Sequence, residues 1–263
     1  MRSLSIASTG MLAQQLNVEV ISNNIANMNT TGFKRQRAEF QDLLYQTIER
    51  VGASSSDQGT VLPTGIQVGS GVKTASVYRI MQQGNLTSTE NTYDLAIEGK
   101  GFFRIQMPAG GTAYTRAGSL AVNAEGQIVT PDGYTVEPGI NIPQDSTSIT
   151  VNPQGQVVVR LAGQTTDTVI GQFDLAVFAN EAGLESQGSS LYIETPASGP
   201  ATTGTPGSTG FGTITQGFLE TSNVNAVAEI TSLITAQRAY EMNSKVITVS
   251  DEMLSMTSRL ARS

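Results

Sequence analysis

The sequence predicts an α+β fold in which discontinuous N- and C-terminal α-helices pair as a coiled-coil module, with a mostly-β domain inserted between them. All nine prolines lie between Pro63 and Pro206, and no glycine follows Gly217, so both ends of the chain are free to form long helices. From about Tyr93 onward the hydrophobic pattern changes to a period of two, which is typical of strands.

The terminal helices are predicted from apolar residues that recur at the seven-residue spacing of a coiled coil. In the N-terminal segment the main row consists of Leu4, Met11, Val18 and Ile25, accompanied by Ala7, Ile21 and Met28. In the C-terminal segment the main row consists of Leu233, Tyr240, Ile247 and Leu254, with Ala239, Val246, Met253 and Leu260 beside it. The two main rows form a candidate self-assembly interface.

An ordinary helical hairpin packed on a globular core would show similar rows. Three features favour helices that pack among copies of themselves. The first 32 residues contain no aromatic side chain, both rows lie at the chain ends, and each terminal segment is balanced in charge. Since an isolated helix is only marginally stable in water, we expect both ends to be disordered in the monomer and to become helical on assembly.

An asparagine-rich segment follows the N-terminal row. Asn24 and Asn27 place amide side chains within or next to the helical seam, where such groups can hydrogen-bond between helices and set their register. Both residues therefore belong to the candidate interface. Gly32 is expected to end the helix in a left-handed cap.

Between the ends, an amphipathic segment from Phe33 to Val51 is predicted to contain a third helix, followed by a flexible loop rich in glycine and serine. Residues 122–129 and 151–158 share the order strand, Asn-led turn with glycine, strand, which predicts two similar hairpins. Residues 102–107 and 169–178 indicate further strands.

The composition of residues 196–212, rich in Gly, Pro, Ser and Thr, predicts a linker. The predicted boundaries are 1–32 plus 226–263 for the helical module, 33–72 plus 206–225 for a connecting and bracing segment, and 73–205 for the inserted β domain.

Composition excludes most catalytic and metal chemistry. The chain contains no cysteine, histidine or tryptophan, so thiolate nucleophiles, imidazole bases and the common zinc or haem sites are ruled out. The Gly99-Lys100-Gly101 run lacks the Ser/Thr and the helix that follow in a phosphate loop. Acidic pairs such as Glu181 with Glu185 are expected to be solvated. We therefore expect no enzyme activity and no catalytic, cofactor-binding or metal-binding residue.

Net charge and hydropathy limit the classes of partner that this chain is expected to bind. The net charge is −7, and the densest basic run is only Lys34, Arg35 and Arg37, so nucleic acid is an unexpected partner. No run approaches the length of a membrane span, and the first ten residues lack the apolar core of a secretory signal. The prediction is no membrane insertion and either a cytosolic protein or one exported without a cleaved signal peptide.

Several motifs, in order along nearly the whole chain, resemble those of flagellar rod and hook proteins. They are Asn23–Arg35, Gln83–Leu86, Asp94–Phe103, Tyr114–Ser119, Glu220–Asn225 and Ala236–Lys245. The resemblance implies a structural axial subunit that is exported unfolded through the flagellar type III export apparatus. It also implies assembly under a rod cap into a helical homopolymer at the basal body, spanning the periplasm and outer membrane.

Within that family, Asp42–Ile48 followed by Gly52, Ala53, Ser54, Ser55 and Ser56 is similar to the segment that distal rod members use to keep the rod straight. A proximal rod or hook-type axial protein is the alternative. A distal position implies contacts with the proximal rod protein, the hook protein and the L- and P-ring proteins, which the acidic inserted domain would face. A wall hydrolase is disfavoured for want of His or Cys, and a secreted surface polymer would leave the paired terminal rows unexplained.

Overall fold

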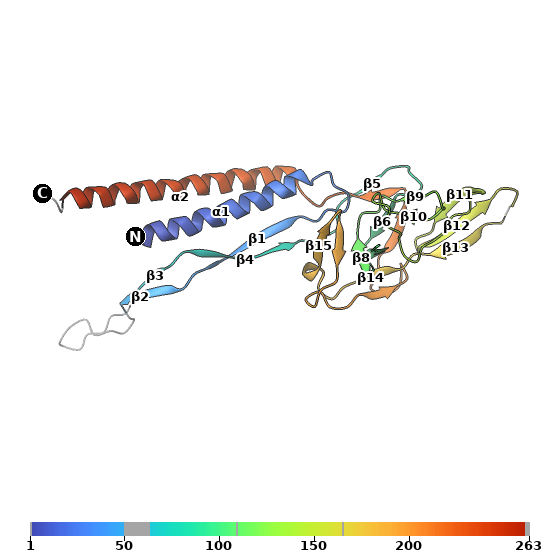
Figure 1. The fold of residues 1–263 in the computed structure, drawn as a ribbon, viewed down its shortest axis with the longest axis horizontal. Coiled ribbons are helices and arrows are strands. Elements are labelled where there is room, and N and C mark those ends of the chain that lie inside the picture. The colour runs from blue at the N-terminus through green and yellow to red at the C-terminus, as the bar shows by residue number, and fades with distance from the viewer. Residues whose placement is uncertain (1, 50–63, 109, 165, 261–263) are drawn as a thin grey trace. The chain divides into compact units, whose positions relative to one another are not determined.

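The computed structural model describes residues 2–49, 64–108, 110–164 and 166–260, and the chain divides into two compact units (Figure 1). The helical unit contains the described residues of 1–25, 36–78 and 226–263. The β-rich unit contains the described residues of 26–35 and 79–225. The chain therefore enters the β-rich unit twice, and both of its ends belong to the helical unit.

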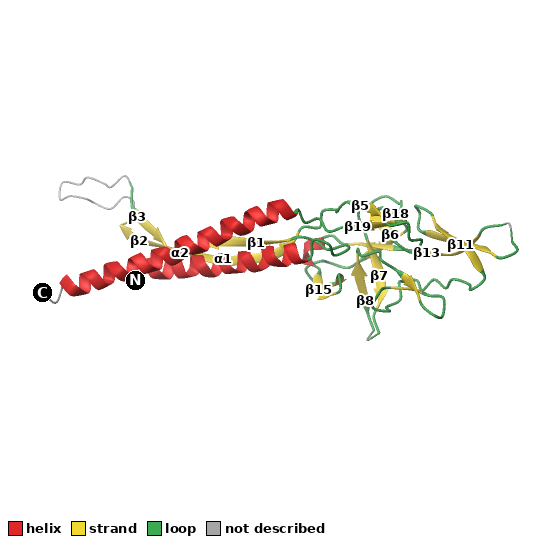
Figure 2. Cartoon of the chain, turned by 90° about the horizontal axis from the view of Figure 1, so that it is seen from above, coloured by secondary structure: helices red, strands yellow, loops and turns green. Residues whose placement is uncertain are grey.

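In the helical unit, α1 (Arg2–Ala26) and α2 (Ala226–Leu260) lie side by side in antiparallel directions (Figures 1 and 2). The predicted terminal helices and the α+β class are confirmed. A ribbon of four strands completes the unit: β1 (Gln36–Asp42) pairs with β4 (Val72–Arg79), and β2 (Tyr45–Glu49) pairs with β3 (Ile66–Gly69). Among the described residues, neither helix is long and apolar enough to cross a membrane.

The helix predicted between Phe33 and Val51 is wrong, because residues 36–42 and 45–49 form strands. Exposure in β1 mostly alternates from residue to residue, and β2 contains Tyr45, Thr47 and Ile48, residue types that favour strands. The apolar residues of this segment are spaced as on one face of a helix, but pairing with β3 and β4 makes the segment a pair of strands. Leu44, an apolar residue within that segment, is 86% exposed.

The predicted helix cap at Gly32 is also wrong. Helix α1 ends at Ala26, and residues 27–32 form turns in the β-rich unit. Gly32 does adopt the left-handed region, with φ +67°, but its role is close packing. Its backbone N–H donates to the carbonyl oxygen of Glu220 at 2.9 Å, and an added methyl group would lie 2.7 Å from the backbone nitrogen of Ala117.

The β-rich unit is built from short strands in several small sheets (Figure 2). A six-stranded sheet has the order β15-β16-β8-β7-β14-β17, and a three-stranded sheet has the order β11-β12-β13. The remaining pairs are β9 with β10, β6 with β18, and β5 with β19. The bounds are β5 (Leu86–Ser88), β6 (Leu95–Glu98), β7 (Phe102–Gln106), β8 (Thr112–Thr115), β9 (Ala121–Val122), β10 (Ile128–Val129), β11 (Ser146–Val151), β12 (Gln156–Leu161), β13 (Thr168–Gln172), β14 (Leu175–Val177), β15 (Glu185–Gly188), β16 (Leu191–Ile193), β17 (Thr202–Gly204), β18 (Thr213–Gln216) and β19 (Phe218–Glu220), with a short 3-10 helix at Glu181–Gly183.

The two predicted hairpins are confirmed and share one turn chemistry. The side-chain oxygen of Asn123 accepts the backbone N–H of Gln127, and that of Asn152 accepts the N–H of Gln156, each at 2.8 Å. The glycine of each turn, Gly126 or Gly155, has a positive φ. The repeat in sequence is therefore a repeat in structure.

The segment at 196–212 is not a free linker. Residues 202–204 form β17, which pairs with β14 at the edge of the six-stranded sheet. The backbone N–H of Gly212 donates to the carbonyl oxygen of Lys100 at 2.7 Å, and the ring of Phe211 packs against Gly204. The glycines and prolines here serve tight turns within a packed edge.

Candidate self-assembly surface of the helical unit

Two contacts fix the register of α1 against α2. The side-chain amide of Asn24 donates to the carboxylate of Glu229 at 3.1 Å. A methyl group built on Gly10 would lie 2.9 Å from Nδ2 of Asn243, so the helices approach closely there. The two contacts are two heptads apart on both helices, which places Asn17 opposite Ala236 between them. The helices therefore meet through small and polar side chains.

Asn24 ties three segments of the helical unit together. Its side chain is 1% exposed. Besides Glu229, it donates to the backbone carbonyl of Gln36 and accepts the N–H of the same residue, both at 2.8 Å. One amide thereby connects α1, α2 and the first residue of β1, and satisfies both backbone polar groups of the half-buried Gln36.

The large apolar residues chosen from the sequence flank this contact row. Six of them are half-buried: Leu4, Met11, Val18, Ile25, Leu233 and Ile247. Tyr240 and Leu254 are 43% and 44% exposed. Asn27 lies beyond α1 in the β-rich unit, where it accepts a hydrogen bond from the hydroxyl of Thr30. Residues 52–56, the candidate straightness loop, lie outside the described residues.

The structure brings Val18 and Tyr240 to one hollow of about 490 Å³ between the helices, here called the α1–α2 hollow. Its other lining residues are Gln15, Glu19, Gln237 and Glu241. Val18 and Tyr240, one from each helix, line this hollow beside the contact row of small and polar residues.

Helix α2 carries a second apolar row, here called the outer stripe, which does not include the residues Glu229 and Asn243 that contact α1. Its members recur at intervals of three or four residues, apart from interruptions such as Arg238, and all are exposed. They are Val227, Ile230, Ile234, Met242, Val246, Val249, Met253, Met256 and Leu260. Exposed apolar side chains that gather along one side of a charged helix favour a protein interaction surface.

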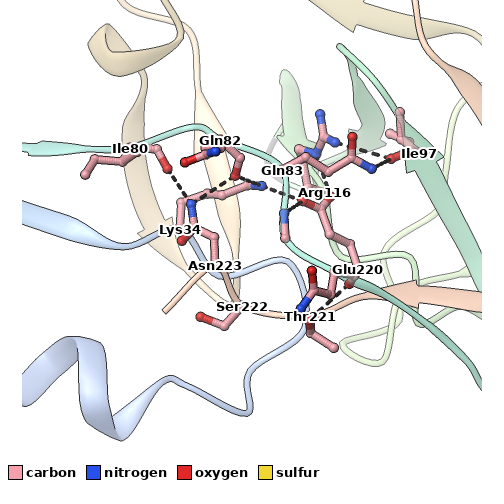
Figure 3. Close-up of polar contacts among 12 residues, drawn as sticks. Lys34, Ile80, Gln82, Gln83, Ile97, Arg116, Glu220, Thr221, Ser222 and Asn223 are labelled. Carbon is pink, nitrogen blue, oxygen red and sulfur yellow. Dashed lines mark hydrogen bonds and ion pairs between the residues drawn. The ribbon is translucent and has the colours of Figure 1, made fainter. Parts of the chain in front are cut away.

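A buried ionic cluster in the β-rich unit was not predicted from the sequence (Figure 3). The carboxylate of Glu220 lies 2.6 Å from Nζ of Lys34 and 2.8 Å from Nε of Arg116, and Glu220 and Lys34 have fully buried side chains. Glu220 also accepts the backbone N–H of Gly84 at 2.8 Å. Arg116 donates to backbone carbonyls including that of Gly101. Here the term Glu220 cluster means Lys34, Arg116 and Glu220.

The charges of the cluster stabilise one another. Burial alone would raise the pKa of Glu220, but Arg116 and Lys34 outweigh it, so this pKa lies below its ordinary value. Burial lowers the pKa of Lys34, although Glu220 opposes that shift. The only sequence signal was that all three charged residues stand inside the quoted motifs. Nothing in the sequence paired residues 186 positions apart.

In the described part of the chain, no three side chains capable of holding a metal ion come together. What the described residues show instead is two paired terminal helices, the second with exposed apolar side chains, on a chain whose remainder is mostly β. This arrangement favours the class of structural proteins that assemble through their terminal helices.

Comparisons with known proteins identify the family. Residues 4–34 match the flagella basal body rod protein family, residues 96–159 the D1 domain of flagellar hook protein FlgE/F/G, and residues 215–260 the C-terminal region of flagellar basal body rod FlgEFG proteins. The chain is 62% identical to flagellar basal-body rod protein FlgG of Caulobacter vibrioides, over 99% of both chains. It is 53% identical to the protein of the same name in Agrobacterium fabrum, over 98% of this chain and 99% of the relative. The chain belongs to the flagellar basal-body rod protein family.

Proposed function

We propose that this chain is the structural subunit of the distal rod of the flagellar basal body. In this role it polymerises into a rigid hollow shaft that transmits torque from the motor to the hook, and it catalyses no reaction. The observation that carries the proposal is the outer stripe of α2, an exposed apolar face on the unit that holds both chain ends. Similarity over the full length to FlgG proteins supports it.

The proposal includes specific partners and a route. The homopolymer would join the proximal rod protein at one end and the hook protein at the other, with the L- and P-ring proteins around it. Subunits would pass unfolded through the type III export apparatus, without loss of a signal peptide, and fold beneath a rod cap. The β-rich unit would form the outer wall, where 13 acidic residues against four basic ones between residues 90 and 220 would limit adhesion to the rings.

The terminal helices are proposed to gain most of their stability on assembly. The outer stripe is exposed in a single chain, and burying an apolar side chain of this kind stabilises by roughly 1.5–3 kcal/mol. Residues 33–72 would brace neighbouring subunits, and Gly52–Ser56 would keep the rod straight. Amide exchange tests the first point: strong protection of residues 5–28 in dilute monomer would contradict it.

Negative-stain microscopy of concentrated full-length protein tests the function. We expect straight tubes from the unaltered chain, and none after deletion of residues 1–30 or 230–263. The substitution Ile247→Asp should act like deletion, because it buries a charge in the assembled tube. Glu125→Gln, at an exposed site of the β-rich unit, is the control and should leave tubes intact. Tubes that form equally well without the termini would overturn the proposal.

A further inference from the structure

We infer that the α1–α2 hollow receives the C-terminal end of α2 from a second copy of this chain, with the Arg259 side chain of that copy beside Glu19 and Glu241. The inference rests on the proposed function, because it names the contact by which subunits join.

The hollow is lined by both apolar and acidic side chains. Val18 and the ring of Tyr240 line it, while Glu19 and Glu241, from the two helices, are both exposed at its edge. Gln15 donates to Glu19 at 3.1 Å, which holds that carboxylate at the hollow. Within the described length of α1, Glu19 is the sole acidic residue. The hollow therefore suits an apolar side chain that has a positively charged side chain next to it.

The end of α2 carries that combination. Because Gly10 faces Asn243, the first described residue of α1 reaches only to about Asp251, and residues 252–260 of α2 extend beyond α1 (Figure 1). Every residue of this overhang is exposed. Met256, Arg259 and Leu260 lie on one face of it, at helical spacings of three and four. Glu252, at the opposite end of the overhang, lies about two turns away from Arg259.

The chain cannot fill its own hollow. Tyr240 and Met256 belong to one continuous helix and are 16 residues apart, which corresponds to about 24 Å. The occupant must therefore come from another molecule. Each copy offers one overhang and one hollow, so the contact joins two different surfaces and can repeat from copy to copy. Where the copies do not close into a reciprocal dimer or a ring, the repeated contact produces a polymer.

Cysteine cross-linking tests the contact, and the chain is suited to it because it contains no cysteine. Protein carrying Val18→Cys is mixed with protein carrying Met256→Cys, assembled and oxidised. We expect a disulfide-linked dimer as the main product on a non-reducing gel. The matched control pairs Val18→Cys with Val227→Cys, an exposed residue of the outer stripe at the start of α2, and should give little dimer.

Charge reversal tests the same contact without cross-linking. Glu19→Arg with Glu241→Arg, or Arg259→Glu alone, should raise the critical concentration for assembly about tenfold, since repulsion replaces attraction. The triple variant should return to within about threefold of the unaltered protein. All three altered residues are exposed, so circular dichroism should show unchanged folding.

The possible outcomes distinguish a failure of the inferred contact from a failure of the proposed rod function. If the unaltered chain forms tubes but Val18→Cys links to Val227→Cys rather than to Met256→Cys, or the triple variant shows no rescue, the inference is overturned and the proposed function stands. If the unaltered chain forms no tubes under any condition, the proposed function fails and the inference falls with it.

Discussion

Nζ of Lys34 lies 2.6 Å from the carboxylate of Glu220, and both side chains are fully buried although 186 residues separate them in sequence. Lys34 comes just before the point where the chain leaves the β-rich unit for β1, and Glu220 a few residues before it leaves for α2. The backbone of Gly32 also donates to the carbonyl of Glu220. The pair therefore joins, inside the β-rich unit, two segments that adjoin the helical unit in sequence.

Removing the charge of Glu220 should destabilise the β-rich unit strongly. Glu220→Gln leaves Lys34 and Arg116 buried without a counter-charge, and breaking a buried pair in this way costs about 3–5 kcal/mol. We expect that loss in the free energy of unfolding measured with urea. The control is Asp167→Asn, which removes a half-exposed partner of Arg160 and should cost at most about 1 kcal/mol. Equal losses in the two variants would contradict the role given to burial.

The Glu220 cluster should also make stability depend on acid pH. The pKa of Glu220 is lowered in the folded state from its ordinary value of 4.5, so the folded state binds this proton less readily than the unfolded state does. The stabilisation is therefore fully present above pH 4.5 and is lost as the pH falls through the lowered folded-state pKa. Unfolding free energies of the unaltered chain and Glu220→Gln should differ by a constant amount between pH 6 and 8 and converge below pH 4.5. A difference that grows on acidification would refute this assignment.

A close backbone contact makes Gly118 intolerant of any side chain. A methyl group there would lie 1.5 Å from the carbonyl oxygen of Leu95, which is backbone and cannot rotate away. Gly118→Ala should cost about 3 kcal/mol or more, at or above the usual range for overpacking. Gly133→Ala is the matched control: its φ is +84° but nothing lies within 4 Å, so only about 1–2 kcal/mol of backbone strain is expected. Thermal unfolding of both variants measures the difference.

Features set by local chemistry could be predicted from the sequence. The absence of proline from both chain ends and of glycine from the C-terminal end, together with heptad spacing, was enough to predict α1 and α2. The turns at Asn123 and Asn152 were predictable because one side chain and one nearby glycine define each of them. The segment at 36–49 was not predictable, since its spacing suits a helical face and a twisted ribbon alike, and only pairing with β3 and β4 decides between them.

The details of the helix pairing depend on side-chain size, which periodicity does not express. Gly10 and Met11 belong to two adjacent rows that repeat every seven residues. Gly10 makes the close contact with α2, because a residue without a side chain lets the two helix backbones approach. Heptads therefore predict that a seam exists without deciding which of two adjacent rows faces the partner helix. The Glu220 cluster was beyond sequence reasoning for a different cause: its members meet only when the β-rich unit is folded.

The side-chain amide of Asn24 should be needed for assembly because it donates hydrogen bonds to Gln36 and Glu229. Asn24→Asp keeps the shape but loses both donated hydrogen bonds and sets a second carboxylate against Glu229. If the paired helices are the unit that polymerises, this variant should raise the critical concentration for tube formation about tenfold, equivalent to about 1.4 kcal/mol. Sedimentation of the assembled fraction at increasing protein concentration measures it. Ser22→Asp is the control, because it adds the same charge on the exposed side of α1 and should change the critical concentration less than about twofold. Similar increases for both variants would mean that helix charge, rather than the hydrogen bonds of Asn24, governs assembly.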